Sequence, residues 1–215
     1  MTIEKGQEWG HRGQRPQSVR VVHSDTDLVD AWTQDSSTVF VVMAGDLHMA
    51  LGQPKWQDDQ TECQFLPVDV FHVTVTQQHD HQHSAHNSEA KDVVETFAVS
   101  SVCIGSWFTR GRFITVSNCG FVGRYNIAPR AHPNDGEMDV VTVYSGMDWR
   151  QRVQARSRAR LGQHVPHPQI SMERGRSHSW NKESKREKLF IDGREIRNWA
   201  SVEITVIPDA CTVVV

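Results

Sequence analysis

Residues 65–75 have the sequence FLPVDVFHVTV, and this stretch decides the expected fold. Apolar and polar residues alternate along it, which is typical of a β-strand with one face in a core, because successive strand side chains point to opposite faces. Other segments of strand character follow it, separated by Gly, Asn and Asp turns: residues 93–104, 111–118, 138–144, 188–193, 202–208 and 211–215. Repeated short strands with such turns predict an antiparallel, sandwich-like β domain over residues 64–215.

The residues before this domain have a different pattern. Residues 1–17 are polar and without periodicity, so we expect a flexible tail. Residues 18–43 predict a strand, a helix capped by Ser24 or Asp25, and a second, buried strand. We therefore expect a small α/β unit over residues 18–60, in a chain that is mainly β.

Composition narrows the class of protein further. The chain has 215 residues and a formal net charge of −3, which gives no argument for nucleic-acid binding. Its four cysteines are widely spread and form no C-x-x-C pair, so we expect reduced, buried thiols. No apolar run approaches the roughly 18 residues of a transmembrane helix. The first eight residues lack the apolar core of a secretory signal, so we expect a cytoplasmic protein.

Two segments rich in basic side chains offer candidate sites. One is a polar loop whose imidazoles can bind Zn or Ni adventitiously, although a solvated loop accounts for the same composition: His79, His81, His83 and His86. The other is a predicted helix over residues 148–160 with five arginines: Arg150, Arg152, Arg156, Arg158 and Arg160. They can face phosphates or an anionic membrane surface. The alternative is an ordinary solvated face, with Val153 and Ala155 or Ala159 turned inward.

Two turns offer places for an ion. Residues 118–124 have the sequence NCGFVGR, in which Gly120 and Gly123 would let the backbone approach an anion closely, although glycine pairs also mark ordinary turns. Residues 128–139, APRAHPNDGEMD, form a Pro-bounded loop in which Asp135 can offer a carboxylate to a hard cation beside backbone oxygens. An Asx turn that closes a hairpin is the simpler interpretation of the same loop.

Together and in this order, four stretches resemble the diacylglycerol kinase-like lipid kinases, a superfamily that includes the sphingosine kinases and, more distantly, the NAD kinases. They are residues 118–124, residues 129–139, the Asp192-Gly193 hairpin and residues 207–213, so the resemblance covers roughly residues 64–215. It implies a β-rich domain, as in the C-terminal domain of these kinases, beside a nucleotide-binding α/β domain. It also implies that the acceptor lipid enters the cleft between the two.

The resemblance suggests positions for ligands. Candidate contacts to a ligand or a phosphate are Asn118, Gly120, Gly123, Arg124 and Arg194. In the family, a Mg²⁺ loop matches the Pro-bounded loop described above. It implies a metal held by Asp135, with backbone carbonyls at the positions of His132 and Glu137.

The N-terminal part departs from this family. Its members have a Gly-Gly-Asp-Gly-Thr turn that cradles the ATP phosphates, and nothing like it occurs in residues 1–60. Residues 42–54 resemble the last element of the nucleotide domain, with Asp46 matching an acid of the family, so we interpret the small α/β unit as a remnant of that domain. The acid that follows Asp-Gly in the kinases is replaced by Arg194, and Glu195 comes one residue later, where a strand points it to the opposite face. Asp46 and Glu195 are therefore vestigial catalytic candidates.

Phosphoryl transfer depends on positioning and neutralising the phosphates, so a chain without the cradle is not expected to bind ATP or to phosphorylate lipids alone. We expect a degenerate kinase-like protein that binds a lipid, an anionic metabolite or a protein partner, and that touches membranes only at their surface. The alternative is an active kinase with a divergent or partner-completed nucleotide site, which requires Asp46 or Glu195 in an accessible cleft. A third interpretation is a homo-oligomer formed by edge pairing of the apolar residues 212–215.

Overall fold

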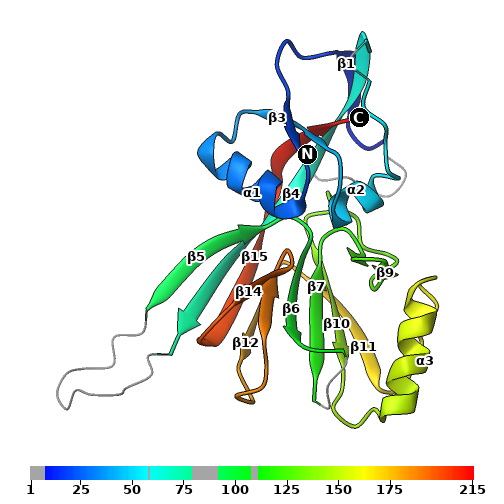
Figure 1. Cartoon of the computed structure of the whole chain (residues 1–215), viewed down its shortest axis with the longest axis vertical. Helices are drawn as coiled ribbons and strands as arrows, with labels where there is room; N and C mark the ends of the chain where they lie inside the picture. The colour runs from blue at the N-terminus through cyan, green and yellow to red at the C-terminus, as the bar shows by residue number, and fades with distance from the viewer. Residues whose placement is uncertain (1–7, 58, 79–91, 108–110) are drawn as a thin grey trace, which may run out of the picture.

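The computed structural model describes residues 8–57, 59–78, 92–107 and 111–215 (Figure 1). The histidine-rich loop with His79, His81, His83 and His86 lies outside the described residues. Two sheets, three helices and a short two-stranded ribbon make up the described part of the chain. Within these ranges, no helix is long and apolar enough to span a membrane.

Two long strands form the spine of the first sheet. β4 (Glu62–Gln77) and β15 (Trp199–Val214) are antiparallel neighbours, and Figure 1 shows them running from the α/β unit into the β domain. Five shorter strands join them: β1 (His11–Gln14), β2 (Arg20–Val22), β3 (Val39–Val42), β5 (Val93–Ala98) and β12 (Ser177–Asn181). At one end the strand order is β1-β4-β15-β3-β2, while β5 pairs with β4 and β12 with β15 at the other end.

The second sheet consists of six antiparallel strands in the order β11-β10-β7-β6-β13-β14. Their bounds are β6 (Ser101–Gly105), β7 (Phe113–Ser117), β10 (Met138–Val143), β11 (Ile170–Gly175), β13 (Leu189–Ile191) and β14 (Arg194–Ile196). The ribbon consists of β8 (Phe121–Val122) and β9 (Tyr125–Asn126). The predicted antiparallel, sandwich-like domain is thus confirmed.

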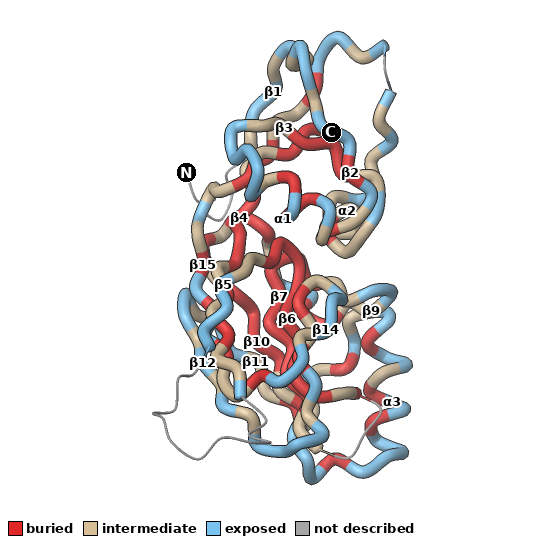
Figure 2. The backbone as a smooth tube through the Cα atoms, turned by 60° about the vertical axis from the view of Figure 1, so that its left-hand side comes forward, coloured by how far each residue is buried: buried red, intermediate tan, exposed pale blue. Residues whose placement is uncertain are grey.

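Both faces of the second sheet are covered. Val102 and Ile104 of β6 point into the sandwich core, where they meet Phe71, Val73 and other buried side chains of the first sheet. Figure 2 shows this core as buried segments of β4, β6, β7 and β10. Cys103, between the two, belongs to a second cluster on the opposite face, under helix α3 (Trp149–Ala159). This face carries the candidate site described below.

The α/β unit has the predicted order of elements. β2 and β3 are parallel and are connected by α1 (Asp25–Gln34), and α2 (Asp46–Ala50) follows β3. Ser24 caps α1, since its hydroxyl accepts a hydrogen bond of 3.0 Å from the amide of Asp27. Leu28 of α1 is buried in a cluster that also contains Val213 of β15. The strand–helix–strand prediction is confirmed, and the unit shares a sheet with the β domain.

Three predictions about strands are wrong. Residues 11–14, placed in a flexible tail, form β1 and pair with β4. Residues 93–104, predicted as one strand, are β5 and β6 in different sheets, because the amides of Val99, Ser100 and Ser101 donate to the carboxylate of Asp192 and not to a neighbouring strand.

The third concerns the interpretation as a homo-oligomer, which requires residues 212–215 to lie at a free edge. Thr212 and Val213 pair with β3 on one side and with β4 on the other. The backbone groups of Thr212 and Val213 are already paired on both sides. A strand of a second molecule therefore has no free edge here to pair with.

Helix α3 covers the predicted residues, but the side chains that it buries differ from those expected. Asp148 caps it in a capping box with Gln151. Ala155 and Ala159 are buried as expected, whereas Val153 is 61% exposed. Arg152, predicted among the anion-facing arginines, is instead buried, and its guanidinium donates to the carbonyls of Met147 and Tyr144.

Candidate functional site

A cavity of about 840 Å³ lies where the α/β unit, the second sheet and α3 meet. Cavities of this size hold small-molecule ligands. Its floor is the face of the second sheet that points away from the sandwich core, with Cys103 of β6, Phe113 of β7 and Phe190 of β13. Further apolar lining comes from Trp107, Val122 and Ile127. The larger part of the cavity wall is therefore suited to an apolar group.

The carboxylate of Asp25 lies at one end of this cavity. It accepts hydrogen bonds of 2.7 Å from the amide of Asp46 and 3.2 Å from that of Leu47, the first two residues of α2. Gly45 makes this approach possible: its φ is +107°, and a Cβ there would lie 2.5 Å from Oδ1 of Asp25. Asp25 therefore joins the helix start of α1 to that of α2.

Two further carboxylates line the same end of the cavity, and backbone amides hold both. Oδ1 of Asp46 accepts from the amide of Gly123 at 2.7 Å, which connects α2 to the turn of the β8–β9 ribbon. Asp192 is partly exposed at the tip of its hairpin, but its carboxyl group is enclosed by the bend after β5. There it accepts from the amides of Val99 and Ser101, both at 2.8 Å.

Burial raises the pKa values of all three acids. The pKa of Asp25 rises to about 7, because burial and the nearby charge of Asp192 outweigh its amide hydrogen bonds. The pKa of Asp46 rises to about 6 through burial, against the effect of the Gly123 amide. Burial also raises the pKa of Asp192. Near neutral pH, this end of the cavity can both donate and accept a hydrogen bond, which suits a hydroxyl group.

Basic side chains line other parts of the cavity: Arg156 of α3, Arg186 and Lys188. The ammonium group of Lys188 lies 3.2 Å from a carboxylate oxygen of Glu195. The guanidinium group of Arg156 lies 5.0 Å from the centre of the Tyr125 ring, another part of the lining. The cavity thus combines an apolar floor, an acidic end and basic groups on its wall.

The structure brings two of the predicted site residues into this cavity, Asp46 and Gly123, and they contact each other. Arg124 is their neighbour, and its guanidinium lies 5.6 Å from the Tyr125 ring centre. Arg194 lies outside the cavity and pairs with Asp30 at 3.0 Å. Glu195 does not line the cavity either and pairs with Lys188 as described above.

Asn118 and Gly120 have internal partners. The buried side-chain amide of Asn118 donates to the carbonyls of Asp69 and Val99, at 2.8 and 3.0 Å. Gly120 has a φ of +83°, and a Cβ there would lie 2.6 Å from the carbonyl oxygen of Ala128. Asn118 and Gly120 thus stabilise the loop after β7, and neither residue lines the cavity.

The predicted metal loop contacts an arginine. The guanidinium of Arg174 on β11 pairs with Asp135, lies 3.2 Å from Glu137 and 3.4 Å from Asp139. His132 accepts a hydrogen bond from the amide of Asn134 at 3.2 Å. Among the described residues, no group of three or more His, Cys, Asp or Glu is arranged to hold a metal. As arranged, the loop fits a guanidinium, so metal binding by Asp135, His132 and Glu137 stays a prediction.

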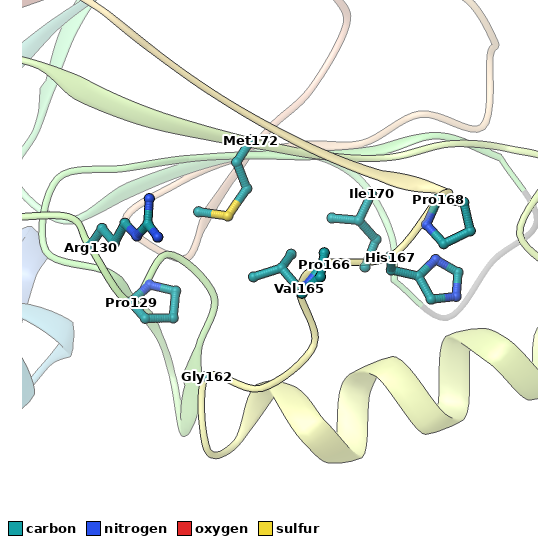
Figure 3. A pocket seen from close by; sticks show the side chains of 9 residues that line it. All are labelled: Pro129, Arg130, Gly162, Val165, Pro166, His167, Pro168, Ile170 and Met172. Carbon is teal, nitrogen blue, oxygen red and sulfur yellow. The ribbon is translucent and has the colours of Figure 1, made fainter.

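A second cavity, of about 980 Å³, lies between α3 and β11 (Figure 3). Its lining is mainly prolines and aliphatic side chains: Pro129, Arg130, Gly162, Val165, Pro166, His167, Pro168, Ile170 and Met172. None of these described lining residues is an acid, in contrast to the first cavity. The first cavity combines carboxylates whose pKa values are raised with an apolar floor, so it is the stronger candidate for a functional site.

Sequence reasoning missed the site roles of Asp25 and Asp192. The sequence predicts Asp25 only as a helix cap, and Asp192 only as part of a hairpin that resembles the kinase family. One signal was available: Asp25 follows β2 and Asp46 follows β3, and ligands of parallel sheets bind beyond the carboxyl ends of the strands. The floor residues Cys103, Phe113 and Phe190 carried no such signal, because alternate strand residues on either face of the second sheet are equally apolar.

Comparison with known proteins gives a family and a fold. The family model of the YegS C-terminal NAD kinase beta sandwich-like domain matches residues 101–215, more than half of the chain. A solved structure titled "A putative diacylglycerol kinase from Bacillus anthracis str. Sterne" is similar, with a TM-score of 0.53 and 13% identity; 90% of this chain and 76% of that chain are covered. "The crystal structure of a diacylglycerol kinases from Bacillus anthracis str. Sterne" has a TM-score of 0.50 and 15% identity with the same coverage. No curated protein matches the chain.

Proposed function

Because this chain belongs to the family of the YegS C-terminal NAD kinase beta sandwich-like domain, we propose that it uses a lipid-kinase-like fold to bind an amphiphilic alcohol and does not itself transfer a phosphoryl group. The cavity between the α/β unit and the second sheet is the binding site. The solved proteins of similar fold that are titled as diacylglycerol kinases support a lipid alcohol as the class of ligand.

The composition of the cavity carries this proposal. Its floor of Cys103, Phe113 and Phe190 suits an acyl chain, since burying apolar surface drives binding. At its acidic end, Asp25 with a pKa of about 7 and Asp46 with a pKa of about 6 suit a hydroxyl, which donates to one carboxyl and accepts from the other. An amphiphilic alcohol fills both parts.

The connection from β3 to α2 argues against phosphoryl transfer. It consists of three residues, 43–45, and the whole of residues 1–60 lacks the Gly-Gly-Asp-Gly-Thr turn. Charge neutralisation of ATP phosphates by such a turn supplies much of the rate of kinases. One observation favours the active-kinase alternative: Asp46, one of its two candidate acids, lines the cavity. The other candidate, Glu195, does not.

The test is a titration of the chain with a monoacylglycerol of ten carbons, below its aggregation concentration, followed by calorimetry. We expect saturable binding that Phe190→Glu weakens at least about tenfold, because a charge then lies on the apolar floor. The control is Val94→Glu, an exposed position on β5 that is not part of the cavity lining. Absence of binding by the folded wild type, or equal affinity in Phe190→Glu, would refute the proposal.

A parallel titration with ATP and Mg²⁺ tests the active-kinase alternative, which requires the chain to bind the nucleotide. We expect no heat at millimolar ATP. Micromolar binding that Asp46→Ala abolishes would instead support the active kinase.

A second proposal concerns the outer face of α3, which suits an anionic membrane surface. Trp149 is 62% and Val153 61% exposed, four residues apart on one face, and the guanidinium of Arg150 lies 5.4 Å from the Trp149 ring centre. Interfacial binding combines such apolar side chains with basic ones. We expect Trp149→Ala to lower binding to phosphatidylglycerol vesicles in a sedimentation assay; unchanged binding would contradict this proposal.

A further inference from the structure

Three arginine side chains converge on one aromatic ring. The guanidinium carbons of Arg124, Arg156 and Arg160 lie 5.6, 5.0 and 6.0 Å from the centre of the Tyr125 ring. From this geometry we propose that the three arginines and the phenol bind a phosphate group at the cavity, so that the amphiphile it takes is a phosphate monoester. This inference rests on the proposed function, because it specifies the ligand of the same site.

The arginines come from two separate elements. Arg124 and Tyr125 belong to the turn and second strand of the β8–β9 ribbon. Arg156 lies in the last turn of α3 and Arg160 is its C-cap residue, four positions later, so both lie on the side of the helix that meets β9. Packing of the helix against the ribbon therefore creates the cluster.

The charges of this cluster favour an anion. Across the parts of the chain that the structure describes, no carboxylate forms an ion pair with Arg124 or Arg160. Burial acts to raise the pKa of Tyr125, but hydrogen bonds from Arg124 and Arg160 and the charge of Arg156 outweigh it and lower that pKa. The three guanidinium groups thus make the surroundings of the phenol electropositive, which favours a phosphate there.

A phosphate group matches these donors in number and shape. Guanidinium groups present parallel N–H donors that pair with phosphate oxygens, and the phenol adds one O–H donor. Tyr125 and Arg156 also line the cavity, together with the apolar floor and the acids of the α/β unit. One ligand can therefore place its phosphate at Tyr125, its chain on the floor and its free hydroxyl at Asp46.

The experiment compares three ligands: the ten-carbon monoacylglycerol, its phosphate monoester and glycerol phosphate. We expect the phosphate monoester to bind at least about tenfold more tightly than the neutral lipid, with a difference that shrinks as salt increases. The double variant Arg156→Gln/Arg160→Gln should abolish that difference, so that it binds the neutral lipid and its phosphate with equal affinity. The matched control Arg150→Gln/Arg158→Gln removes the same charge from the same helix and leaves the three arginines at the Tyr125 ring in place, so it should keep the difference.

The outcomes separate this inference from the proposed function. Equal affinity of the wild type for the neutral lipid and its phosphate overturns the phosphate site while the lipid site stands. If neither lipid binds, the proposed function fails, and titration with glycerol phosphate then decides the arginine cluster alone. In that case, binding of glycerol phosphate that Arg156→Gln/Arg160→Gln removes and the control variant keeps would support a soluble phosphate ester as the ligand. If glycerol phosphate does not bind either, the inference is overturned. Circular dichroism of each variant checks that α3 is intact.

Discussion

The carboxylate of Asp69 shows how one buried residue organises a whole loop. It accepts hydrogen bonds from the amides of Gly136 and Asp209, at 2.7 and 2.9 Å, and from the side-chain amide of Asn134 at 3.3 Å. β4 carries Asp69, so these bonds connect the strand to the Pro-bounded loop and to the bulge of β15. Burial raises its pKa, which the two amide bonds oppose.

We predict that Asp69→Ala lowers the free energy of unfolding by roughly 2–4 kcal/mol, because two buried donors and one half-buried donor lose an acceptor. Urea denaturation measures this. Asp30→Ala, which removes a surface ion pair with Arg194, should cost under about 1 kcal/mol. Equal losses in the two variants would contradict the role of Asp69.

Asp25 predicts a dependence of stability on pH. Its pKa is about 7 in the folded chain and about 3.9 when unfolded, so over that window the folded state holds the extra proton. The contribution of Asp25 to stability is therefore greatest below pH 4 and falls as pH rises to about 7. Asp25→Asn removes this titration, so from pH 5 to pH 8 the variant should gain roughly 2–3 kcal/mol relative to the wild type.

The measurement is urea unfolding of wild type and Asp25→Asn at four pH values between 5 and 8. Other acids and histidines change both proteins alike, so only the difference between them is used. A difference that stays constant, or that changes in the opposite direction, would contradict the raised pKa of Asp25.

Among elements, α3 shows what the sequence could and could not predict. Its range and its capping residue follow from local sequence, and the structure confirms them. Its five arginines divide into the buried Arg152, the pair Arg156 and Arg160 at Tyr125, and the exposed Arg150 and Arg158. Helical periodicity groups these positions, but residues of one type give no contrast in hydrophobicity to indicate which group faces the sheet.

The β10–β11 pair offers a test of the metal-loop prediction. Asp139 of β10 is directly opposite Arg174 of β11, and the arginine also contacts Asp135 and Glu137. We predict that Arg174→Gln leaves these carboxylates without a cation, lowers the Tm by several degrees, and makes the Tm rise again with added Ca²⁺ or Mg²⁺. Thermal scans of the wild type with the same ions test the native loop, where a rise would show that the metal binds beside Arg174.

A variant that loses stability without responding to either ion would contradict metal binding by this loop. Arg176→Gln, a change of the same kind two residues along the chain, is the control and should leave the Tm within about 2 °C of the wild type.

At the scale of the whole molecule, alternation of apolar residues predicted the sandwich, but not how its strands are distributed. β5 and β6 separate at Val99–Ser101 because the carboxylate of Asp192, some 90 positions along the chain, accepts their amides. β1 lacks a hydrophobic pattern, and its pairing with β4 alone makes it a strand. The cavity lies where the α/β unit, the second sheet and α3 pack together, and a local sequence pattern cannot predict contacts between segments so far apart in the chain.

Since β4 and β15 extend through both the α/β unit and the sandwich, we predict a single unfolding transition. Urea denaturation followed by tryptophan fluorescence and by far-UV circular dichroism should give coincident curves. Trp32 packs in the cluster of the α/β unit and the buried Trp199 in the sandwich core, so subtracting the curve of Trp32→Phe or of Trp199→Phe from that of the wild type isolates the signal of each unit. Two resolved transitions would show that the units unfold independently.

The pairing of Thr212 and Val213 with Val39 and Phe40 has a consequence for synthesis of the chain. A ribosome releases residues 39–42 long before residues 212–213 exist, so β3 emerges without the neighbour that completes its sheet. During most of translation its apolar edge is open to chaperones or to other nascent chains. Contacts of such long sequence separation also slow folding, so the nascent protein reaches its final sheet only once β15 has left the exit tunnel.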